Sequence, residues 1–238
     1  IMHLSKRLQR VADNVLSGGV VADIGCDHGF TSIYLIRHKK VTKAIAMDIN
    51  EGPLERAKEH MLSYGVEEHM ELRLSDGLQM LDADEADTLL ISGMGGALIC
   101  QILEAKEEVT KSAKELVLSP QSEIFLVRKC LHCMGFCIAH EEMLLDQGKY
   151  YVIIRAVKAK EKEKEQYQRE EDYIYGHCLI EDKDPFFIGF LKKEEKRVSR
   201  ILEGMAQKTL SANAMKQYAG LKKELEQIHT VQQRIKKD

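Results

Sequence analysis

Residues 23–29 read DIGCDHG and place two glycines, two carboxylates and an imidazole within one short segment. An apolar run at 20–22 comes before this segment, and a stretch with helical character at 31–36 follows it. A glycine-rich turn between a parallel strand and a helix usually marks a nucleotide-binding crevice, because glycine lets the backbone come close to the ligand. The segment therefore predicts a ligand of nucleotide type, and its charged side chains select among such ligands.

Asp27 stands where a dinucleotide-binding loop has a glycine. A carboxylate at this position repels the pyrophosphate that a helix N-terminus otherwise attracts. It does not repel a ligand that lacks phosphate and carries positive charge, and S-adenosylmethionine, with its sulfonium and ammonium groups, is such a ligand. Asp27 therefore favours methyl transfer over hydride transfer.

Acidic residues lie at the ends of three successive predicted strands. Ligands of an open parallel sheet bind at the carboxyl ends of its strands, so these acids are expected to face one site. Asp23 is expected to brace the loop or to meet the methionine ammonium through water, Asp48 to accept both ribose hydroxyls, and Asp76 to bond the adenine amine. Any one of them would also serve as an ordinary helix N-cap, but three in succession favour a ligand site.

The fourth predicted strand ends in the segment SGMGG at 92–96. Many amino-methylating enzymes carry an Asn/Asp-Pro-Pro-aromatic loop here, whereas the glycines of this chain leave room for a flat group close to the backbone. The alternative is a plain glycine-rich N-cap for the next helix. The residues expected to bind the cofactor are Asp23, Gly25, Cys26, Asp48, Ile49, Asp76, Gly77, Ser92, Gly93 and Met94.

Short apolar strands alternate with helical segments through the first two thirds of the chain. Strands are predicted at 20–24, 43–48, 70–74, 88–92 and 115–119, and helices at 30–38, 53–65, 97–106 and 123–134. An amphipathic opening helix is expected to end at Gly18-Gly19, and Asn50 is expected to cap the helix that follows it. This alternation predicts a mostly parallel sheet with helices on both faces.

Two further strands, at 136–145 and 149–157, are joined by only three residues. Three residues cannot form a parallel crossover, so these strands are expected to pair as an antiparallel hairpin. A parallel sheet that ends in a hairpin is the Rossmann-like arrangement of class I methyltransferases, whereas a standard dinucleotide fold stays parallel. The fold class is therefore α/β, and its terminal hairpin and Asp27 point independently to the same ligand.

The C-terminal third of the chain has a different pattern. An alternation of lysine and glutamate at 158–165 predicts a solvated helix or linker. Apolar residues at three- and four-residue steps over 188–205 and 215–235 predict two helices, joined near 211–213, that pair as an antiparallel coiled coil. We therefore predict a methyltransferase domain at 1–158 and a helical arm at 159–238. The arm is expected either to bind substrate or to serve a structural or dimerising role.

The composition bounds the remaining expectations. The 238 residues carry a net charge of −3, which by itself does not indicate nucleic-acid binding. No run of eighteen apolar residues exists, so we expect no membrane association and a cytoplasmic location. We also expect a monomer or weak dimer. Cys130 and Cys133 are spaced as zinc ligands but fall on a helical pattern and lack a second CxxC pair, so we expect free thiols and no metal.

Four features together resemble the bacterial tRNA (adenine-22-N1)-methyltransferases. They are the DIGCDHG segment, the SGMGG segment, the Arg7-Leu8 pair and the run Lys149-Tyr150-Tyr151. The resemblance covers the whole chain and implies a class I methyltransferase domain, a coiled-coil arm, S-adenosyl-L-methionine as cofactor and tRNA as partner. The chain departs from the family pattern at Cys26, where serine or threonine is common, and at 30–32, where a Tyr-Leu-Pro-like stretch is expected.

Methylation of adenine N1 needs no strong base, because N1 carries a free lone pair at neutral pH. The base must be exposed or flipped out, and the enzyme gains mainly from proximity and orientation. Asp27 and His28 are the catalytic candidates. Asp27 would contact the adenine amine or stabilise the charge on the methylated ring, and His28 would orient Asp27, shuttle a proton or merely hydrogen-bond the loop.

The residues expected to contact the substrate are Arg7, Phe30, Gly95 and Tyr150. Two other functions stay open at this point: a methyltransferase of a small molecule, and a non-catalytic adapter that binds a protein through the coiled coil. The length and polarity of the arm speak against a lid over a small pocket. An adapter would have no need of the acidic strand ends.

Overall fold

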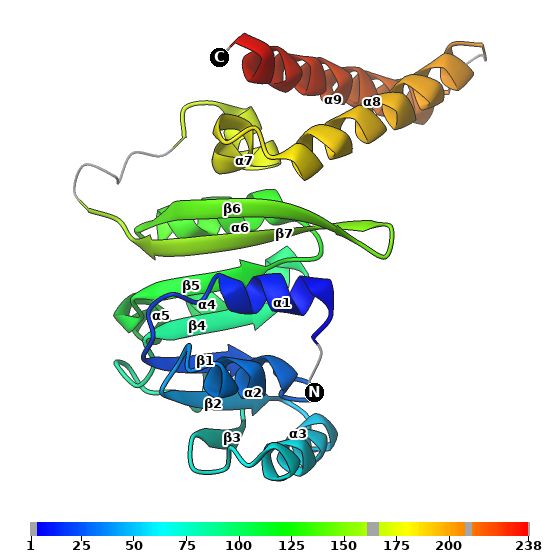
Figure 1. Cartoon of the computed structure of the whole chain (residues 1–238). Helices are drawn as coiled ribbons and strands as arrows, with labels where there is room; N and C mark the ends of the chain where they lie inside the picture. Colours follow the sequence, from blue (N-terminus) through cyan, green and yellow to red (C-terminus); the bar gives the residue numbers. More distant parts are fainter. Residues whose placement is uncertain (1–3, 161–166, 208–210, 238) are drawn as a thin grey trace.

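The structure is a computed structural model that describes residues 4–160, 167–207 and 211–237. A seven-stranded sheet with the order β3-β2-β1-β4-β5-β7-β6 forms its centre (Figure 1). The strands are β1 (Val20–Ile24), β2 (Lys43–Asp48), β3 (Met70–Leu74), β4 (Thr88–Ser92), β5 (Glu115–Ser119), β6 (Phe136–Asp146) and β7 (Lys149–Lys158). The first five strands are parallel, and β7 runs antiparallel to both β5 and β6. The predicted fold class, a mostly parallel sheet with a terminal hairpin, is confirmed.

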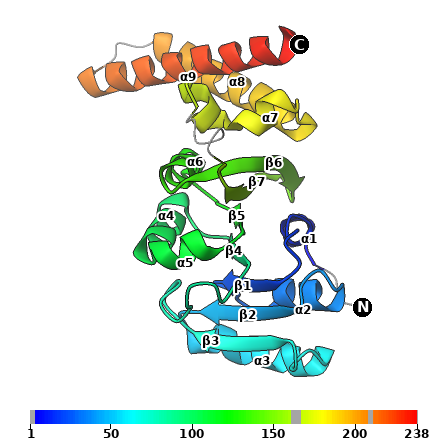
Figure 2. The ribbon, with the colours of Figure 1, turned by 90° about the vertical axis from the view of Figure 1, so that its left-hand side faces the viewer.

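Helices cover both faces of the sheet (Figure 2). One face carries α1 (Lys6–Asp13), α2 (Phe30–Arg37) and α3 (Glu51–Tyr64), and the other carries α4 (Gly96–Ala105), α5 (Glu107–Ser112) and α6 (Ile124–Cys133). The central strands are almost completely buried as a result, which explains why their sequences are continuous apolar runs and not alternating ones. The short helix α5 has no apolar period and was not predicted.

One predicted helix end is wrong, and one predicted N-cap is confirmed in position. The first helix ends at Asp13 and not at Gly18-Gly19, because the side-chain amide of Asn14 donates to the Arg10 carbonyl at 3.0 Å and to Glu142 at 2.8 Å. Asn50 occupies the N-cap position of α3, but its side chain makes no capping bond. Its backbone N–H instead donates to Oδ1 of Asp48 at 3.0 Å.

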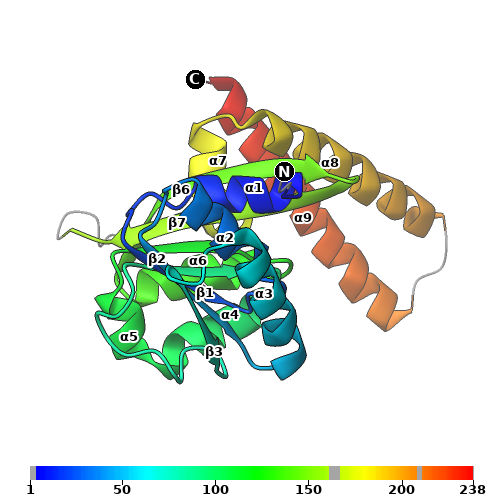
Figure 3. The ribbon, with the colours of Figure 1, turned by 60° about the horizontal axis from the view of Figure 1, so that its bottom comes forward.

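The C-terminal segment forms a helical arm above the hairpin (Figures 1 and 3). It consists of a π-helical turn, η2 (Asp172–Gly176), followed by α7 (His177–Glu181), α8 (Pro185–Ala206) and α9 (Ala212–Lys237). The helices α8 and α9 pack through the apolar side chains Val198, Leu202, Ile228 and Val231. Most of the predicted linker, residues 161–166, lies outside the described residues, as does the segment 208–210. The turn predicted at 211–213 is misplaced, because α9 already begins at Ala212.

The buried side chain of Arg128 joins the arm to the sheet. Nε of Arg128 on α6 donates to Glu141 on β6 at 2.7 Å, and its Nη1 donates to the carbonyls of Tyr173 and Ile174 at 2.8 and 2.9 Å. Gly176 has φ +101°, and a Cβ there would lie 2.7 Å from both charged side chains. The apolar core also continues from the sheet into the arm. The domain boundary between residues 158 and 159 stays a prediction.

Candidate cofactor and substrate site

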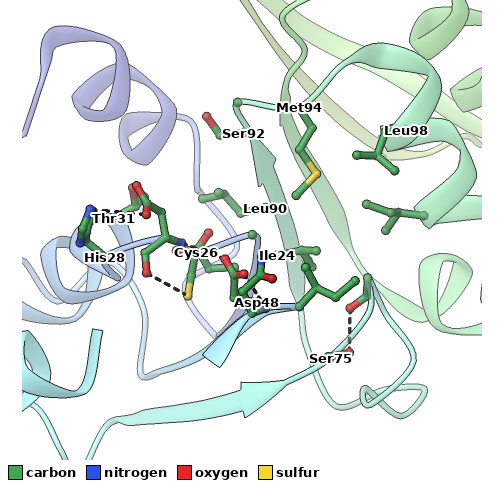
Figure 4. A pocket seen from close by; sticks show the side chains of 18 of the residues that line it. Ile24, Cys26, His28, Thr31, Asp48, Ser75, Leu90, Ser92, Met94 and Leu98 are labelled. Carbon is green, nitrogen blue, oxygen red and sulfur yellow. Dashed lines mark hydrogen bonds and ion pairs between the residues drawn. The ribbon is translucent and has the colours of Figure 1, made fainter. Parts of the chain in front are cut away.

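A pocket of about 510 Å³ opens at the carboxyl ends of the parallel strands (Figure 4). It lies where the strand order reverses between β1 and β4, which is the usual ligand position in such sheets. Its volume falls in the range of small-molecule and cofactor sites. Fourteen of the sixteen predicted site residues line it: Arg7, Asp23, Gly25, Cys26, Asp27, His28, Phe30, Asp48, Ile49, Asp76, Gly77, Ser92, Gly93 and Met94.

The turn after β1 requires glycine at position 25. Gly25 has φ +72°, and a Cβ there would lie 2.2 Å from Cε of Met94. The N–H groups of Gly25 and Cys26 both donate to the carbonyl of Met47, at 2.8 and 2.9 Å. The backbone of this turn is therefore held against β2 and faces Met94 across the pocket.

Asp23 is a buried carboxyl group beneath this turn. Its Oδ2 accepts a hydrogen bond of 2.7 Å from the hydroxyl of Ser32 on α2. Burial, and to a smaller extent the charge of Asp48, raise the pKa of Asp23 to about 6. This contact supports the bracing role that we predicted for Asp23 as one of two alternatives.

Asp48 links the first and second strand-end loops. Its Oδ2 accepts from the backbone N–H of Asp27 at 3.4 Å, and its Oδ1 accepts from Asn50. The carboxylate is buried, whereas the neighbouring Ile49 side chain is 59% exposed at the pocket. A buried acid beside an exposed apolar side chain suits a nucleoside, because the acid bonds ribose hydroxyls and the apolar group covers the flat base.

Asp27 and His28 lie at the mouth of the pocket. Asp27 has φ +51° and its side chain is 70% exposed. The Nε2 atom of His28 is 3.5 Å from Oδ1 of Asp27, and its Nδ1 accepts a hydrogen bond from Arg56 at 3.2 Å. Phe30 stacks on His60 with ring centroids 4.3 Å apart, and Nδ1 of His60 donates to the His28 carbonyl at 3.0 Å. The exposed carboxylate is thus free to meet a ligand, while the imidazole is held by α3.

Arg7 brings the first helix into the pocket from the other side. Its Nη1 donates to the hydroxyl of Ser92 at 2.7 Å, and its guanidinium lies 5.4 Å from the ring centre of Tyr151. A Cβ on Gly93 would lie 3.8 Å from both Arg7 and Gln121. The loop after β4 therefore presents a flat backbone surface between an arginine and a glutamine, as a planar substrate requires.

Tyr150 and Gly95 do not line the pocket. The ring of Tyr150 packs against Phe190 of α8 with centroids 5.5 Å apart, so the prediction that Tyr150 contacts a substrate base in the pocket is not supported. Successive side chains of a strand point to opposite faces, and it is Tyr151 that meets Arg7. Gly95 is the N-cap of α4, and a Cβ there would lie 3.1 Å from the Ser122 hydroxyl.

Several pocket residues were not predicted from the sequence. They are Leu8, Ile24, Thr31, Asn50, Ser75, Leu90, Leu98, Ile102 and Gln121. Leu98 carried a usable signal, since it is an apolar residue in the first turn of the helix that follows the glycine loop. Gln121 carried none, because it comes close to Gly93 only through the pairing of β4 with β5.

No disulfide joins any two of the six cysteines, all of which lie within the described ranges. Burial raises the pKa of the Cys26 thiol, and nearby carboxylates raise it further, which disfavours the thiolate form of this pocket residue. Within the described ranges, no group of three histidine, cysteine or acidic side chains is arranged to hold a metal ion. No helix in the same ranges is long and apolar enough to cross a bilayer.

Comparison with known proteins assigns this architecture to a family. Residues 4–154 match the methyltransferase domain family. The chain is 32% identical over 207 residues to the tRNA (adenine(22)-N(1))-methyltransferase of Bacillus subtilis, and the match covers 87% of each protein. The chain belongs to the tRNA (adenine-22-N1)-methyltransferase family. The predicted resemblance is therefore confirmed.

Solved structures of the tRNA (adenine-22-N1)-methyltransferase family share the whole architecture. The crystal structure of the B. subtilis m1A22 tRNA methyltransferase TrmK is 30% identical, covers 97% of this chain and 99% of its own, and superimposes with a TM-score of 0.85. The Streptococcus pneumoniae protein Sp1610 in complex with S-adenosyl-L-methionine is 28% identical, with a TM-score of 0.84 and coverage of 96% and 99%. The arm is thus a part of the fold that these proteins have in common.

Proposed function

We propose that this chain transfers the methyl group of S-adenosyl-L-methionine to N1 of adenosine 22 in tRNA. One observation carries the proposal. Gly25 and Asp48, which suit a cofactor, line the same pocket as Arg7 and Gly93, which suit a flat acceptor. A methyl donor and a flat acceptor can therefore meet in a single cavity. Family membership supports adenosine 22 as the acceptor.

The residues of the pocket fit the proposed cofactor. S-adenosyl-L-methionine supplies an electrophilic methyl group on a sulfonium. Gly25 provides the backbone surface for its methionine part, and the Asp48 carboxylate has the two oxygens needed for a ribose diol. Asp76 lies exposed at the end of β3, where it can accept a bond from the adenine amine, while Ile49 covers the purine.

The chain's own contribution to the reaction is positioning and electrostatics. N1 of adenine is already a nucleophile, so no base has to remove a proton before the transfer. The methylated ring carries positive charge, and the exposed carboxylate of Asp27 can stabilise that charge as it develops. Arg7 and the flat backbone of Gly93 orient the base, so that N1 lies in line with the methyl carbon.

The arrangement of the chain also bears on its partners. We further propose that the chain acts as a monomer or weak dimer. A tRNA substrate suits action in the cytoplasm, and the described residues include neither a metal-type cluster nor a membrane-spanning helix. A small-molecule methyltransferase would need the same cofactor side of the pocket, so the substrate has to be decided by experiment.

Transfer of labelled methyl groups to unmodified tRNA tests the proposal directly. We expect label in tRNA, a reverse-transcription stop at position 22, and no label in a transcript in which adenosine 22 is replaced by guanosine. Label in a metabolite fraction but not in tRNA would favour the small-molecule alternative. The absence of any S-adenosylmethionine binding by calorimetry would favour the adapter.

The Asp48 assignment has its own test. The loss of a charged acceptor for two hydroxyls is expected to weaken cofactor binding by about ten- to a hundredfold, because hydrogen bonds to charged groups contribute about 1.5–3 kcal/mol. Asp48→Asn keeps the shape of the side chain, and Asp82→Asn, in the loop after β3, is the matched control. Unchanged calorimetric affinity of Asp48→Asn would contradict the ribose role.

A further inference from the structure

Four cations lie over aromatic rings where the start of α1, the tip of the β6–β7 hairpin and the start of α8 meet. The cation and ring-centre pairs are Lys6 and Phe186 at 5.0 Å, Arg7 and Tyr151 at 5.4 Å, Lys149 and Tyr151 at 5.2 Å, and Lys193 and Tyr150 at 5.3 Å. We call Lys6, Arg7, Lys149 and Lys193 the cationic strip. Figures 1 and 3 show that its three elements lie side by side.

The cationic strip is continuous with the pocket. Arg7 lines the pocket and bonds Ser92, and the ring that Arg7 contacts, Tyr151, also holds Lys149. The neighbouring ring, Tyr150, points to the opposite face of β7 and holds Lys193 of the arm. Because the two tyrosines face opposite sides of β7, the cations that they hold extend from the pocket wall to α8.

The ammonium groups of the strip are positioned by rings, and the carboxylate of Asp146 at the hairpin tip accepts from the backbone N–H of Arg7 at 3.3 Å. Among the residues that the structure describes, no carboxylate lies within 4 Å of the ammonium groups of Lys6, Lys149 or Lys193, and all three side chains are exposed. An aromatic ring restrains a cation without cancelling its charge. Lys6 is restrained further, since its Nζ donates to the carbonyl of Leu145 at 3.2 Å.

Many other cations of the chain are paired. Lys43 bonds Glu71 at 2.7 Å, Lys114 bonds Asp87 at 2.6 Å, and Lys223 bonds Glu170 at 3.1 Å. The three lysines of the strip have no such carboxylate partner and lie next to the pocket, in a chain whose net charge is −3. Their charge suits a ligand that brings its own negative charges.

We propose that the cationic strip binds the phosphate backbone of the tRNA substrate next to the target base. This inference rests on the proposed function and deepens it. A base that enters the pocket past Arg7 must continue outward into its own sugar-phosphate backbone, and the strip is the charged surface that begins at Arg7. The partly exposed ring of Phe186, at the start of α8 beside Lys6, offers a surface on which a neighbouring base can stack.

Neutralisation of the three lysines tests the strip. The triple variant Lys6→Gln/Lys149→Gln/Lys193→Gln leaves Arg7 in place, so the pocket stays intact. We expect the Kd for unmodified tRNA, measured by fluorescence anisotropy, to rise at least about tenfold, and the slope of log Kd against log salt to fall by about three. The KM for tRNA should rise in parallel, while kcat at saturating tRNA and the affinity for S-adenosylmethionine stay unchanged.

A second triple variant provides the matched control. Lys58→Gln/Lys129→Gln/Lys222→Gln removes the same charge from α3, α6 and α9. Lys129 and Lys222 also lie over rings, 5.8 Å from the ring centre of Phe125 and 5.2 Å from that of Tyr218. We expect its tRNA affinity to stay within about twofold of the wild type, because charge far from the ligand is screened by salt. Equal losses in the two triple variants would overturn the strip, since they would reflect net charge alone.

The outcomes separate the strip from the proposed function. If the strip variant binds tRNA with the wild-type Kd and salt slope, the strip is wrong even where tRNA is methylated. If the wild type binds tRNA through the strip but transfers no methyl group to it, the strip stands and the proposed function fails. Binding of poly-glutamate as tight as that of tRNA, and lost in the strip variant, would overturn the assignment to nucleic acid.

Discussion

Nε of Arg56 donates a hydrogen bond of 3.2 Å to Nδ1 of His28, from α3 to the turn before α2. Arginine stays protonated and has no acceptor, so Nδ1 must be the acceptor and a neutral His28 carries its proton on Nε2. That atom faces Oδ1 of Asp27 at 3.5 Å. Arg56 is thus a positioning residue, which directs the imidazole N–H toward the carboxylate at the mouth of the pocket.

Replacement of Arg56 by methionine is expected to let His28 adopt both tautomers. The kcat should fall by about tenfold, comparable to the loss of other partners that orient a histidine, while the affinity for S-adenosylmethionine stays the same. The ¹⁵N chemical shifts of His28 should change from those of a single tautomer to those of a mixture of the two tautomers. Arg56→Lys keeps a donor and should recover part of both properties. Unchanged ¹⁵N shifts in Arg56→Met would show that Arg56 does not set the tautomer.

Gly25→Ala tests the turn that faces the cofactor. Its φ of +72° disfavours any side chain by about 1–2 kcal/mol, and the new Cβ would lie 2.2 Å from Cε of Met94. We expect the Kd for S-adenosylmethionine in calorimetry to rise at least tenfold by the ~1.4 kcal/mol-per-decade relation. Addition of Met94→Ala should relieve the contact but not the φ strain. Gly204→Ala, in open space on α8, is the control and should leave the Kd unchanged.

Asp23 is expected to make stability depend on pH. Its pKa in the folded protein, about 6, lies above the ordinary value of 3.8, so the folded state binds more protons than the unfolded state between these pH values. The contribution of Asp23 to the free energy of unfolding therefore falls by about 3 kcal/mol in total as the pH rises from about 4 to 6. It stays low at higher pH.

The variant Asp23→Asn isolates this effect, since its amide oxygen can still accept from Ser32. Urea unfolding should show that this variant is more stable than the wild type at pH 7.5, and the advantage should shrink by pH 4. A stability difference that is the same at both pH values would contradict the raised pKa.

The buried pair of Arg128 and Glu141 predicts a non-additive pair of substitutions. Arg128→Met leaves a carboxylate buried without its partner, so the free energy of unfolding should fall by about 3–5 kcal/mol. The double variant Arg128→Met/Glu141→Leu removes both charges and should recover a large part of that loss. Guanidinium unfolding measures both values. Equal destabilisation by the single and double variants would show that packing, and not charge, dominates this contact.

The apolar runs of the strands and the acids at their ends were local signals, and the predictions that used them were accurate. All five parallel strands begin and end where the pattern places them, and Asp23, Asp48 and Asp76 line one pocket. The reason is physical: a strand buried on both faces needs consecutive apolar residues, and a parallel sheet brings its carboxyl ends to one edge.

What only the tertiary structure decided depends on contacts between distant segments. The hairpin predicted from a three-residue turn did not tell which of Tyr150 and Tyr151 would face Arg7, because a shift of one residue in register exchanges the two faces of a strand. Arg56, Gln121 and the Arg128–Glu141 pair carry no local pattern either. Each acquires its role from a partner that the chain fold, and not the neighbouring sequence, brings within reach.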